Sequence, residues 1–576
     1  MQHGTRIFHG PSPDGPVATV SVVVERGAFE AGITARGAAL LQAWSAARLN
    51  YDAALAEPED PAARAAFLAE WARETLCYRR GAIDYAAGHL EGTPARGAAV
   101  LTCGFHDPEV TRAALLLSLR FARDAGQAGA VPGEVLPLLE SFWERSMGRH
   151  PDFQAGILIR AARARGVPAR PFLPGTKYWL YGEGARGAVF FESMSRADSA
   201  IGAAIQQDKL LSKRMMAQFG LPVAPGLLVR GRADLAEVPT RVGFPCVTKP
   251  PAAGKSRGVT SQIADMAALQ EGFDRAAEIS GGPVLVERHF DGAEYRLLVF
   301  HGRFVGALRR ARPFVVGDGV RTIRALVEDM NRARAASLVK ARYLQPVAVD
   351  AVMEAQLAAL GVSFDTVPEA GDRVPVRSVR GRSAGGTSAR ERGPIHPRLI
   401  ALVEELARAT GLVGLGYDMI TDDISKDPDE AGCAFLELNT TPALAAAVAS
   451  GEWSEEEIGG ALLGDGPGRI PTRLIVAPDG AAEPPEPAPG AAVVKGAWLR
   501  VAGHARQVRA DVPWAAVAQA LRMPEVTSLT IVATPDAIRR HGFPLERLSE
   551  VALGGADLPA AWMEVARDIA DRVGPA

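Results

Sequence analysis

The chain has few cysteines, and they show none of the close spacings that zinc or redox sites use. Its four cysteines, Cys77, Cys103, Cys246 and Cys433, are spread over 576 residues. Cysteines that bind a metal or exchange electrons typically lie a few residues apart in pairs. Isolated cysteines are expected to be buried, reduced thiols, so we predict a cytoplasmic protein without a disulfide framework.

Long apolar runs and an excess of one charge are also absent. No uncharged apolar stretch reaches the about 18 residues that a membrane span needs, and the N-terminus does not have the pattern of a secretory signal. The 64 basic and 66 acidic residues give a formal net charge of −2. We therefore expect no membrane span and no bulk nucleic-acid-binding surface.

Hydrophobic residues make up 48% of the chain and charged residues 23%, as in folded globular proteins. Apolar strand patterns at 18–24 and 98–103 alternate with helical patterns at 38–55 and 108–125. This alternation predicts the α/β (α+β) fold class, with an N-terminal α/β domain over 1–150. The length suggests about three or four domains in all.

After residue 151 the pattern restarts. Helices are predicted at 153–165 and 199–219, the second with Asp198 as its N-cap. A linker rich in Pro and Gly is expected at 471–490. A strand at 528–533 and a helix at 535–541 then predict a small C-terminal α/β domain over 491–576.

Oxygen-bearing side chains mark two late strand patterns. Alternation along 435–439 places Glu437 and Asn439 on one face, and Asp418 would join them if its apolar segment pairs with this strand. Three hard oxygen donors suit Mg²⁺ held against nucleotide phosphates. From this pattern alone, a solvated or turn-capping Glu-x-Asn is the alternative.

A short strand ending at Lys249 leads into a small basic loop that contains Gly254, Lys255, Ser256 and Gly258. Glycines let backbone N–H groups approach phosphate oxygens while lysine supplies charge. A Walker phosphate loop is rejected because Lys249 stands where that motif requires glycine. A surface loop without ligand is the alternative.

Next, a buried-type strand ends at Glu287, and a second strand that begins at 294 carries Arg296. A strand end followed by a hinge suits an adenine, and Arg296 could reach phosphates as a forked donor. A half-exposed edge strand is the alternative for this segment.

In their order, these motifs resemble the ATP-grasp superfamily and, within it, the amino-terminal half of cyanophycin synthetase. Further matching segments are 208–213, 314–319, 322–323, 383–387, 395–397 and 421–425. The resemblance covers 152–470 well and the first 145 residues faintly. It implies an ATP-grasp domain over 151–470 with a lid at about 220–300, the cofactors ATP and Mg²⁺, and a possible homo-oligomer.

The resemblance also implies a role for each candidate residue. ATP would be contacted by Lys209, Lys213, Lys249, Gly254, Lys255, Ser256, Gly258 and Glu287. Mg²⁺ would be held by Asp418, Glu437 and Asn439. The substrate carboxylate and its acyl phosphate would be oriented by Arg310, Ser383, Gly385, Gly386 and Thr387, with Arg296 as a further catalytic arginine.

Two departures limit the resemblance. Cyanophycin synthetase has a second, Mur-ligase-like ATPase domain, and here 468–477 resembles its entry but the phosphate-loop lysine does not follow. The segment 440–444 also departs from the family pattern, which leaves the amine substrate open. We therefore expect one ATP-dependent carboxylate–amine ligation on small amino-acid or peptide substrates. The alternatives are a glutathione-like or D-Ala-D-Ala-like ligation and a non-catalytic ATP-binding module.

Overall fold

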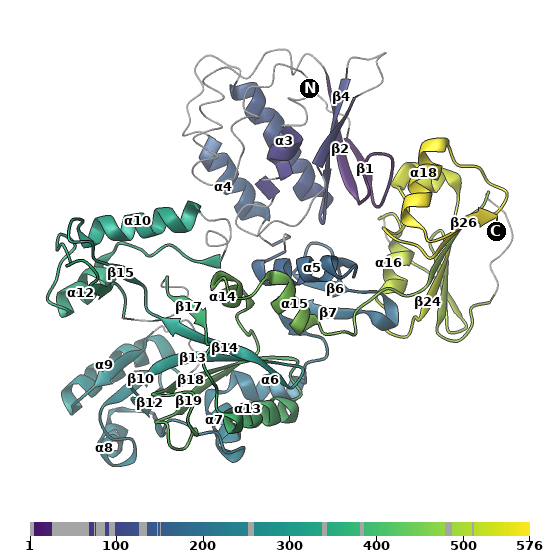
Figure 1. The fold of residues 1–576 in the computed structure, drawn as a ribbon. Coiled ribbons are helices and arrows are strands. Elements are labelled where there is room, and N and C mark those ends of the chain that lie inside the picture. The colour runs from purple at the N-terminus through teal and green to yellow at the C-terminus, as the bar shows by residue number, and fades with distance from the viewer. Residues whose placement is uncertain are drawn as a thin grey trace. The chain divides into compact units, whose positions relative to one another are not determined.

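The structure is a computed structural model that describes residues 5–25, 68–73, 75–76, 87–91, 98–125, 135–146, 148–149, 151–251, 258–336, 343–378, 380, 385–478, 486–509 and 512–575. The chain divides into two compact units (Figure 1). Unit 1 comprises 1–192 and 465–576, and unit 2 comprises 193–464. The predicted helix at 38–55 lies outside the described residues, and the predicted domain boundaries stay predictions.

Unit 1 begins with an antiparallel sheet in the order β1-β2-β4-β3. Its elements are β1 (Thr5–Phe8), β2 (Thr19–Glu25), β3 (Ala87–Glu91) and β4 (Ala98–Gly104), followed by α3 (Pro108–Ala125) and α4 (Val135–Ser146). Val20 and Val22 of β2 are fully buried, as expected of β-branched residues on the inner face of a sheet. The strands predicted at 18–24 and 98–103 and the helix at 108–125 are confirmed.

Unit 1 continues with α5 (Phe153–Ala164), β5 (Ala169–Pro171), β6 (Tyr178–Tyr181) and β7 (Ala188–Phe191). The side chain of Asp152 caps α5 by accepting the backbone N–H groups of Gln154 and Ala155. β5, β6 and β7 pair antiparallel.

The C-terminal part of unit 1 is built on a seven-stranded sheet in the order β23-β22-β21-β24-β20-β25-β26. Its elements are β20 (Thr472–Val476), β21 (Ala491–Lys495), β22 (Trp498–Val501), β23 (His504–Gln507), α16 (Ala515–Leu521), β24 (Ser528–Ala533), α17 (Pro535–His541), β25 (Glu550–Leu553), α18 (Ala560–Ile569) and β26 (Val573–Pro575). β20 pairs in parallel with both β24 and β25. This sheet therefore includes β20, which precedes the predicted domain boundary at residue 491.

The two larger sheets of unit 2 have separate hydrophobic cores. The first sheet has the order β11-β10-β12-β9, with α9 in contact with β10, β11 and β12. Its elements are β9 (Gly226–Val229), α8 (Val238–Arg241), β10 (Cys246–Lys249), β11 (Thr260–Ile263), α9 (Met266–Ser280) and β12 (Val284–Arg288).

The second sheet of unit 2 has the order β17-β14-β13-β18-β19, and all its pairs are antiparallel. Its strands are β13 (Ala293–Phe300), β14 (Arg303–Ala311), β17 (Thr387–Arg390), β18 (Gly414–Thr421) and β19 (Ala434–Asn439). The accompanying helices are α6 (Ala200–Gln207), α7 (Lys209–Gln218), α13 (Pro397–Thr410), α14 (Leu444–Ala449) and α15 (Glu455–Leu463). Only residues 289–292 separate β12 of the first sheet from β13 of the second.

The single helix predicted at 199–219 is wrong, because α6 and α7 are separate helices. Asp208 has extended backbone angles, and its carboxylate accepts the N–H groups of Leu210 and Leu211, so it ends α6 and caps α7. The predicted N-cap is also wrong. Ser199 caps α6, whereas Asp198 accepts backbone N–H groups of Ser195 and Val413.

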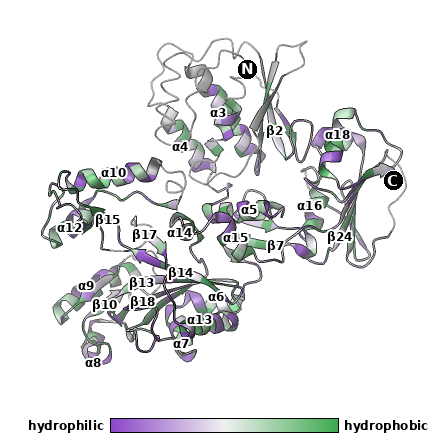
Figure 2. Ribbon diagram, in the orientation of Figure 1, coloured by the Kyte–Doolittle hydropathy of each residue, from purple (hydrophilic) through white to green (hydrophobic). Residues whose placement is uncertain are grey.

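The part of the chain that lies between β14 and β17 in the sequence forms a smaller subdomain with its own apolar core. It consists of β15 (Phe314–Val316), α10 (Ile323–Ala336), α12 (Ala351–Ala359) and β16 (Arg373–Pro375). In Figure 2, hydrophilic and hydrophobic residues interleave along α10 and α18, as expected of helices with one buried face. Among the helices that the structure describes, none combines the length and apolar character needed to span a bilayer.

Phe435 of β19 provides a test of the second core. It is fully buried, and the centroid of its ring lies 6.2 Å from that of Tyr417 in an edge-to-face arrangement. We expect Phe435→Ala to lower the free energy of unfolding by about 3–5 kcal/mol, because it leaves a cavity. The half-exposed Val316 is the control, and Val316→Ala should change stability by no more than about 0.5 kcal/mol. Urea titration measures both, and equal effects would contradict this packing.

Candidate functional site

The site lies where α7 meets both sheets of unit 2. Lys209 and Lys213 are one helical turn apart on α7 and therefore share a face. Lys213 forms an ion pair with Glu287 of β12, and Lys209 lies 3.7 Å from the carboxylate of Glu437 on β19. Lys249, at the end of β10, approaches the second oxygen of Glu287 at 2.5 Å. One helix face thus connects candidate residues from two sheets.

Glu287 is the buried centre of this lysine group. Its side chain is 3% exposed, and that of Lys213 is 9% exposed. Burial alone would raise the pKa of Glu287, but Lys249 and Lys213 outweigh it and hold the pKa below its ordinary value. Burial lowers the pKa of Lys213 to about 8 against the attraction of Glu287, so this lysine is still mostly charged at pH 7.

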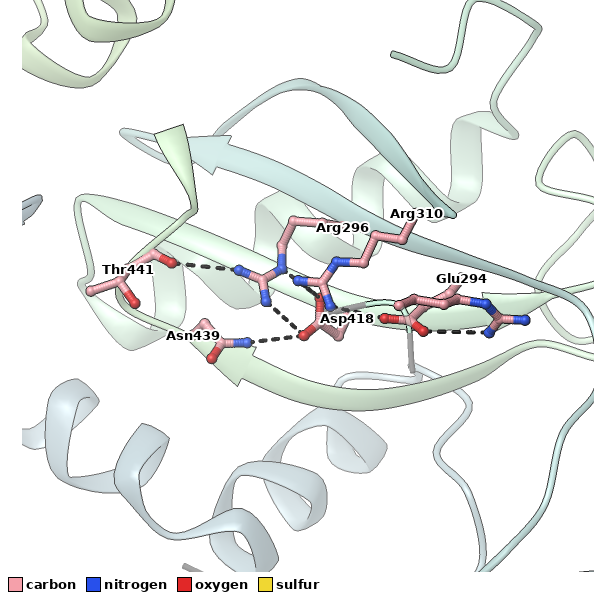
Figure 3. A network of polar contacts seen from close by, with 7 residues as sticks. Glu294, Arg296, Arg310, Asp418, Asn439 and Thr441 are labelled. Atoms are coloured by element: carbon pink, nitrogen blue, oxygen red, sulfur yellow. Dashed lines mark hydrogen bonds and ion pairs between the residues drawn. The ribbon is translucent and has the colours of Figure 1, made fainter. Parts of the chain in front are cut away.

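A second charged group surrounds Asp418 on β18 (Figure 3). Arg296 of β13 grips its carboxylate with two nitrogens, Nε at 2.5 Å and Nη2 at 2.6 Å. Arg310 of β14 lies alongside, 3.2 Å from Asp418 and 2.8 Å from Glu294. Burial would raise the pKa of Asp418, but the two arginines reverse that effect and lower it. At neutral pH Asp418 is therefore a carboxylate.

The predicted pairing of the two oxygen-bearing strands is observed. Asp418 lies directly opposite Glu437 in the β18–β19 register. As drawn in Figure 3, the amide nitrogen of Asn439 lies 3.4 Å from Asp418. With the amide turned over, its nitrogen donates to Glu437 at 2.7 Å and its oxygen accepts from Arg296 at 3.2 Å. Either orientation keeps Asn439 among the candidate carboxylates.

Gln206, which the sequence did not single out, holds the end of β19 in place. Its amide nitrogen donates to the carbonyl of Leu438 at 2.9 Å, and its amide oxygen accepts from the Thr440 hydroxyl at 3.2 Å. Arg296 also reaches the carbonyl of Thr441 at 3.4 Å. The segment that departs from the family pattern is thus fixed to the site by these two side chains.

The glycine pair 385–386 lies beside the arginine strand. Thr387 begins β17, and Ser388 stands opposite Arg310 in the β14–β17 register. Gly385 has a φ of +83°. Its backbone carbonyl accepts a hydrogen bond from the guanidinium of Arg334 on α10 at 2.8 Å. Arg334 is 7% exposed and also donates to the carbonyl of Gln345 at 2.6 Å. Like Gln206, Arg334 fixes a backbone segment of the site, and the sequence did not single it out.

The remaining candidates are placed only in part. Gly258 precedes β11 with a φ of +71°, and a Cβ there would lie 2.8 Å from Ile279. A side chain at this position would therefore be strained by the positive φ. Gly254, Lys255, Ser256 and Ser383 lie outside the described residues.

The donors at this site fit a small hard cation that keeps most of its shell for phosphate and water. Asp418, Glu437 and Asn439 offer carboxylate and amide oxygens from adjacent strands, and the Glu437 side chain is 37% exposed. Within the described residues, no three His, Cys, Asp or Glu side chains gather into a complete metal cage. Carboxylate and amide oxygens are the ligands that Mg²⁺ prefers, whereas zinc sites mostly use His and Cys.

Comparison with known sequences gives the likeness that the motifs predicted. The cyanophycin synthetase of Trichormus variabilis is 27% identical over 349 residues, 59% of this chain and 38% of the relative. The cyanophycin synthetase of Synechocystis is 30% identical over 300 residues, 50% of this chain and 34% of the relative.

The chain is similar to cyanophycin synthetases. It spans little more than a third of their length. The glutathione biosynthesis bifunctional protein GshAB of Clostridium perfringens is 28% identical over 252 residues, 43% of this chain and 32% of that protein. The predicted resemblance to cyanophycin synthetase is confirmed, and so is the α/β fold class. No protein-family profile matches the chain.

Solved structures give a weaker likeness. A bifunctional glutathione synthetase from Pasteurella multocida has a TM-score of 0.40 at 20% identity over 58% of this chain and 48% of its own. D-alanine–D-alanine ligase from Bacillus anthracis has a TM-score of 0.29 at 15% identity over 46% of this chain and 68% of its own.

The Glu287 group predicts a pH-dependent contribution to stability. Glu287→Gln leaves Lys213 and Lys249 buried without a counter-charge, so we expect a loss of about 3–5 kcal/mol at pH 7. Because the folded pKa of Glu287 is below its ordinary 4.5, its contribution is present above pH 4.5 and is lost as pH falls through the folded value.

The difference between wild type and Glu287→Gln should therefore shrink as the pH of a urea titration is lowered from 7 into the acid range. The exposed Glu278→Gln on α9 is the matched control, with little effect at either pH. A difference that stays constant or grows in acid would show that Glu287 is not held ionised by the lysines.

Proposed function

We propose that the chain is an ATP-dependent carboxylate–amine ligase that joins amino-acid or peptide substrates through an acyl phosphate. The observation that carries this proposal is the convergence of lysines, arginines and carboxylates around α7. Lys209, Lys213 and Lys249 lie on one side, and Arg296 and Arg310 surround Asp418 on the other. The sequence similarity to cyanophycin synthetases supports the ATP-grasp assignment of these residues.

In the proposed reaction, the substrate carboxylate attacks the γ-phosphate of ATP, and the bond from that phosphorus to the bridging oxygen breaks. The products of this step are an acyl phosphate and ADP. An amine then attacks the acyl carbon, phosphate leaves, and the amine loses a proton to complete the amide. No nucleophilic side chain is required, because such transfers depend on positioning and charge neutralisation.

The cations of the site supply that neutralisation. Lys249 and Lys213 would bind phosphate oxygens, and backbone N–H groups of the glycine loop would approach the same oxygens. Arg310 would orient the carboxylate, beside the Gly385–Thr387 segment that Arg334 holds. Water exclusion by the closed site would protect the acyl phosphate from hydrolysis.

Asp418, Glu437 and Asn439 would hold Mg²⁺. When bound, the ion supplies positive charge at the phosphate oxygens. In the structure Asp418 is bound by Arg296 and Arg310 instead, so these arginines keep its carboxylate ionised and oriented. Arg296 also fixes Thr441, which connects the orientation of Asp418 to the segment after β19.

The proposal also includes the class of the two substrates. We propose an amide-forming activity on small amino-acid or short peptide substrates. Phosphate release with Mg-ATP across a panel of amino acids and short peptides tests it. Release only with a carboxylate and amine pair supports a ligase. Stabilisation by ATP without any release would instead identify a binding module.

Glu437→Gln tests the oxygen-donor site. It removes one negative oxygen ligand without changing side-chain size, so we expect ATP turnover to fall by roughly 100-fold or more. Thermal unfolding should be nearly unchanged, because Glu437 is partly exposed and its lysine partner is 3.7 Å away. Glu405→Gln, on the exposed side of α13, should keep wild-type turnover. Unchanged turnover in Glu437→Gln would refute the assignment.

Gly385→Ala tests the proposed substrate segment. An alanine Cβ would lie 2.4 Å from Val347, so the segment must shift. We expect turnover to fall by roughly 10- to 100-fold while ATP affinity stays unchanged. Gly361→Ala is the matched control, because Gly361 has a similar φ of +73° with no atom within 4 Å. Steady-state kinetics and ATP titration separate the two effects, and equal loss in both variants would mean that backbone strain alone is responsible.

A further inference from the structure

Unit 1 contains a cavity of about 850 Å³ that takes no part in the site above. Residues far apart in the sequence line it, including His9 after β1, Phe105 after β4, Arg170 of β5 and Trp514 before α16. Backbone hydrogen bonds from His9 to His541 at 2.7 Å and from Phe543 to Pro11 at 2.8 Å join the N-terminal and C-terminal segments at this place. The volume is that of a typical small-molecule site.

The charged residues of the cavity wall are unbalanced toward positive. Among the described residues, the wall has four arginines, Arg149, Arg163, Arg170 and Arg522, and two carboxylates, Asp107 and Glu546. Arg149 is already paired with Asp107 at 2.8 Å.

The pairing of Arg170 is weaker because its partner, Glu183, is shared. Arg170 lies 3.2 Å from the buried Glu183, and Arg469 lies 3.7 Å from the same oxygen. The backbone N–H of Ile470 donates to the other carboxylate oxygen of Glu183 at 3.3 Å. The Nη1 atom of Arg469 is buried without a hydrogen-bond partner among the described residues. One carboxylate therefore serves two guanidinium groups.

Arg522 has no such partner. Among the described residues, no carboxylate oxygen lies within 4 Å of its guanidinium. Burial lowers the pKa of Arg522, and the positive charge of Arg170 lowers it further. A partly buried arginine beside a second arginine costs stability unless an anion accompanies it.

We propose that this cavity binds a small organic carboxylate with an apolar body, of the size of an N-acylated amino acid or a short peptide. The carboxylate would be held by Arg522 as a forked pair, next to Arg170. The apolar body would lie against Phe105, Leu180, Val517 and Leu545, which line the same cavity.

The charge and lining of the cavity favour a carboxylate over a phosphate. A guanidinium fork matches the two oxygens of one carboxylate. A phosphate monoester carries about −1.5 to −2 charges and calls for more donors than one unpartnered arginine. Aliphatic and aromatic side chains also form much of the wall, which suits an apolar ligand body more than a hydrated oxyanion.

The test uses four probes on the full chain, observed by ligand NMR and calorimetry. They are N-acetylphenylalanine, its uncharged amide, phenyl phosphate and inorganic phosphate. We expect N-acetylphenylalanine to bind, the amide to bind at least about tenfold more weakly, and neither phosphate to bind better than the carboxylate. Binding should persist in Glu437→Gln, which separates this cavity from the ATP site.

Arg522→Leu should weaken N-acetylphenylalanine binding at least about tenfold, and Arg522→Lys should restore part of it. The melting temperature of Arg522→Leu should not fall, because the substitution removes a charge that repels Arg170. A purely structural arginine would give the opposite result. Arg506→Leu, at an exposed position on β23, is the matched control and should bind normally. Absence of carboxylate binding, tighter phosphate binding, or binding unaffected by Arg522→Leu would each overturn the proposal.

Discussion

The candidate site depends on one buried carboxylate. Glu287 ends a strand of the first sheet and holds two lysines, one from its neighbouring strand and one from α7. Without Glu287, Lys213 and Lys249 would be like charges in a poorly hydrated place, and each would turn toward solvent. The lysine side of the site is thus arranged by this buried acid.

The opposite side is arranged by the same principle with the charges exchanged. There an acid, Asp418, is fixed by two arginines, and Arg310 is shared with Glu294. Bidentate arginine pairs have a defined geometry, whereas lysine pairs do not. We infer that the arginine side sets the orientation of the reacting groups and that the lysine side mainly supplies charge.

Much of this site could be predicted from sequence because its residues follow strand alternation. Glu437 and Asn439 alternate with apolar residues along β19, and the register places Glu437 opposite Asp418 of β18. Gln206 and Arg334 carry no such signal. Each donates a hydrogen bond to a backbone carbonyl far away in the sequence. Because every residue has a backbone carbonyl, the type of the accepting residue gives no sign of such a contact. The helix break at Asp208 was readable in principle, since an aspartate before a helical run is a usual N-cap. The cavity of unit 1 was not readable, because its arginines come together only through the fold.

The separate cores of the two sheets in unit 2 have a consequence for communication across the site. Met216 of α7 belongs to the core of the second sheet, while Val286 beside Glu287 belongs to the core of the first. A packing change in one core therefore does not pass to the other through close-packed apolar contacts. The connections between the two sheets include residues 289–292, the charged face of α7 and the segment before β9. In that segment Val223 bridges Phe435 of β19, and the carbonyl of Pro225 accepts the backbone N–H of Arg288. The ionic contacts that would bind the nucleotide are thus also one of the connections between the two sheets.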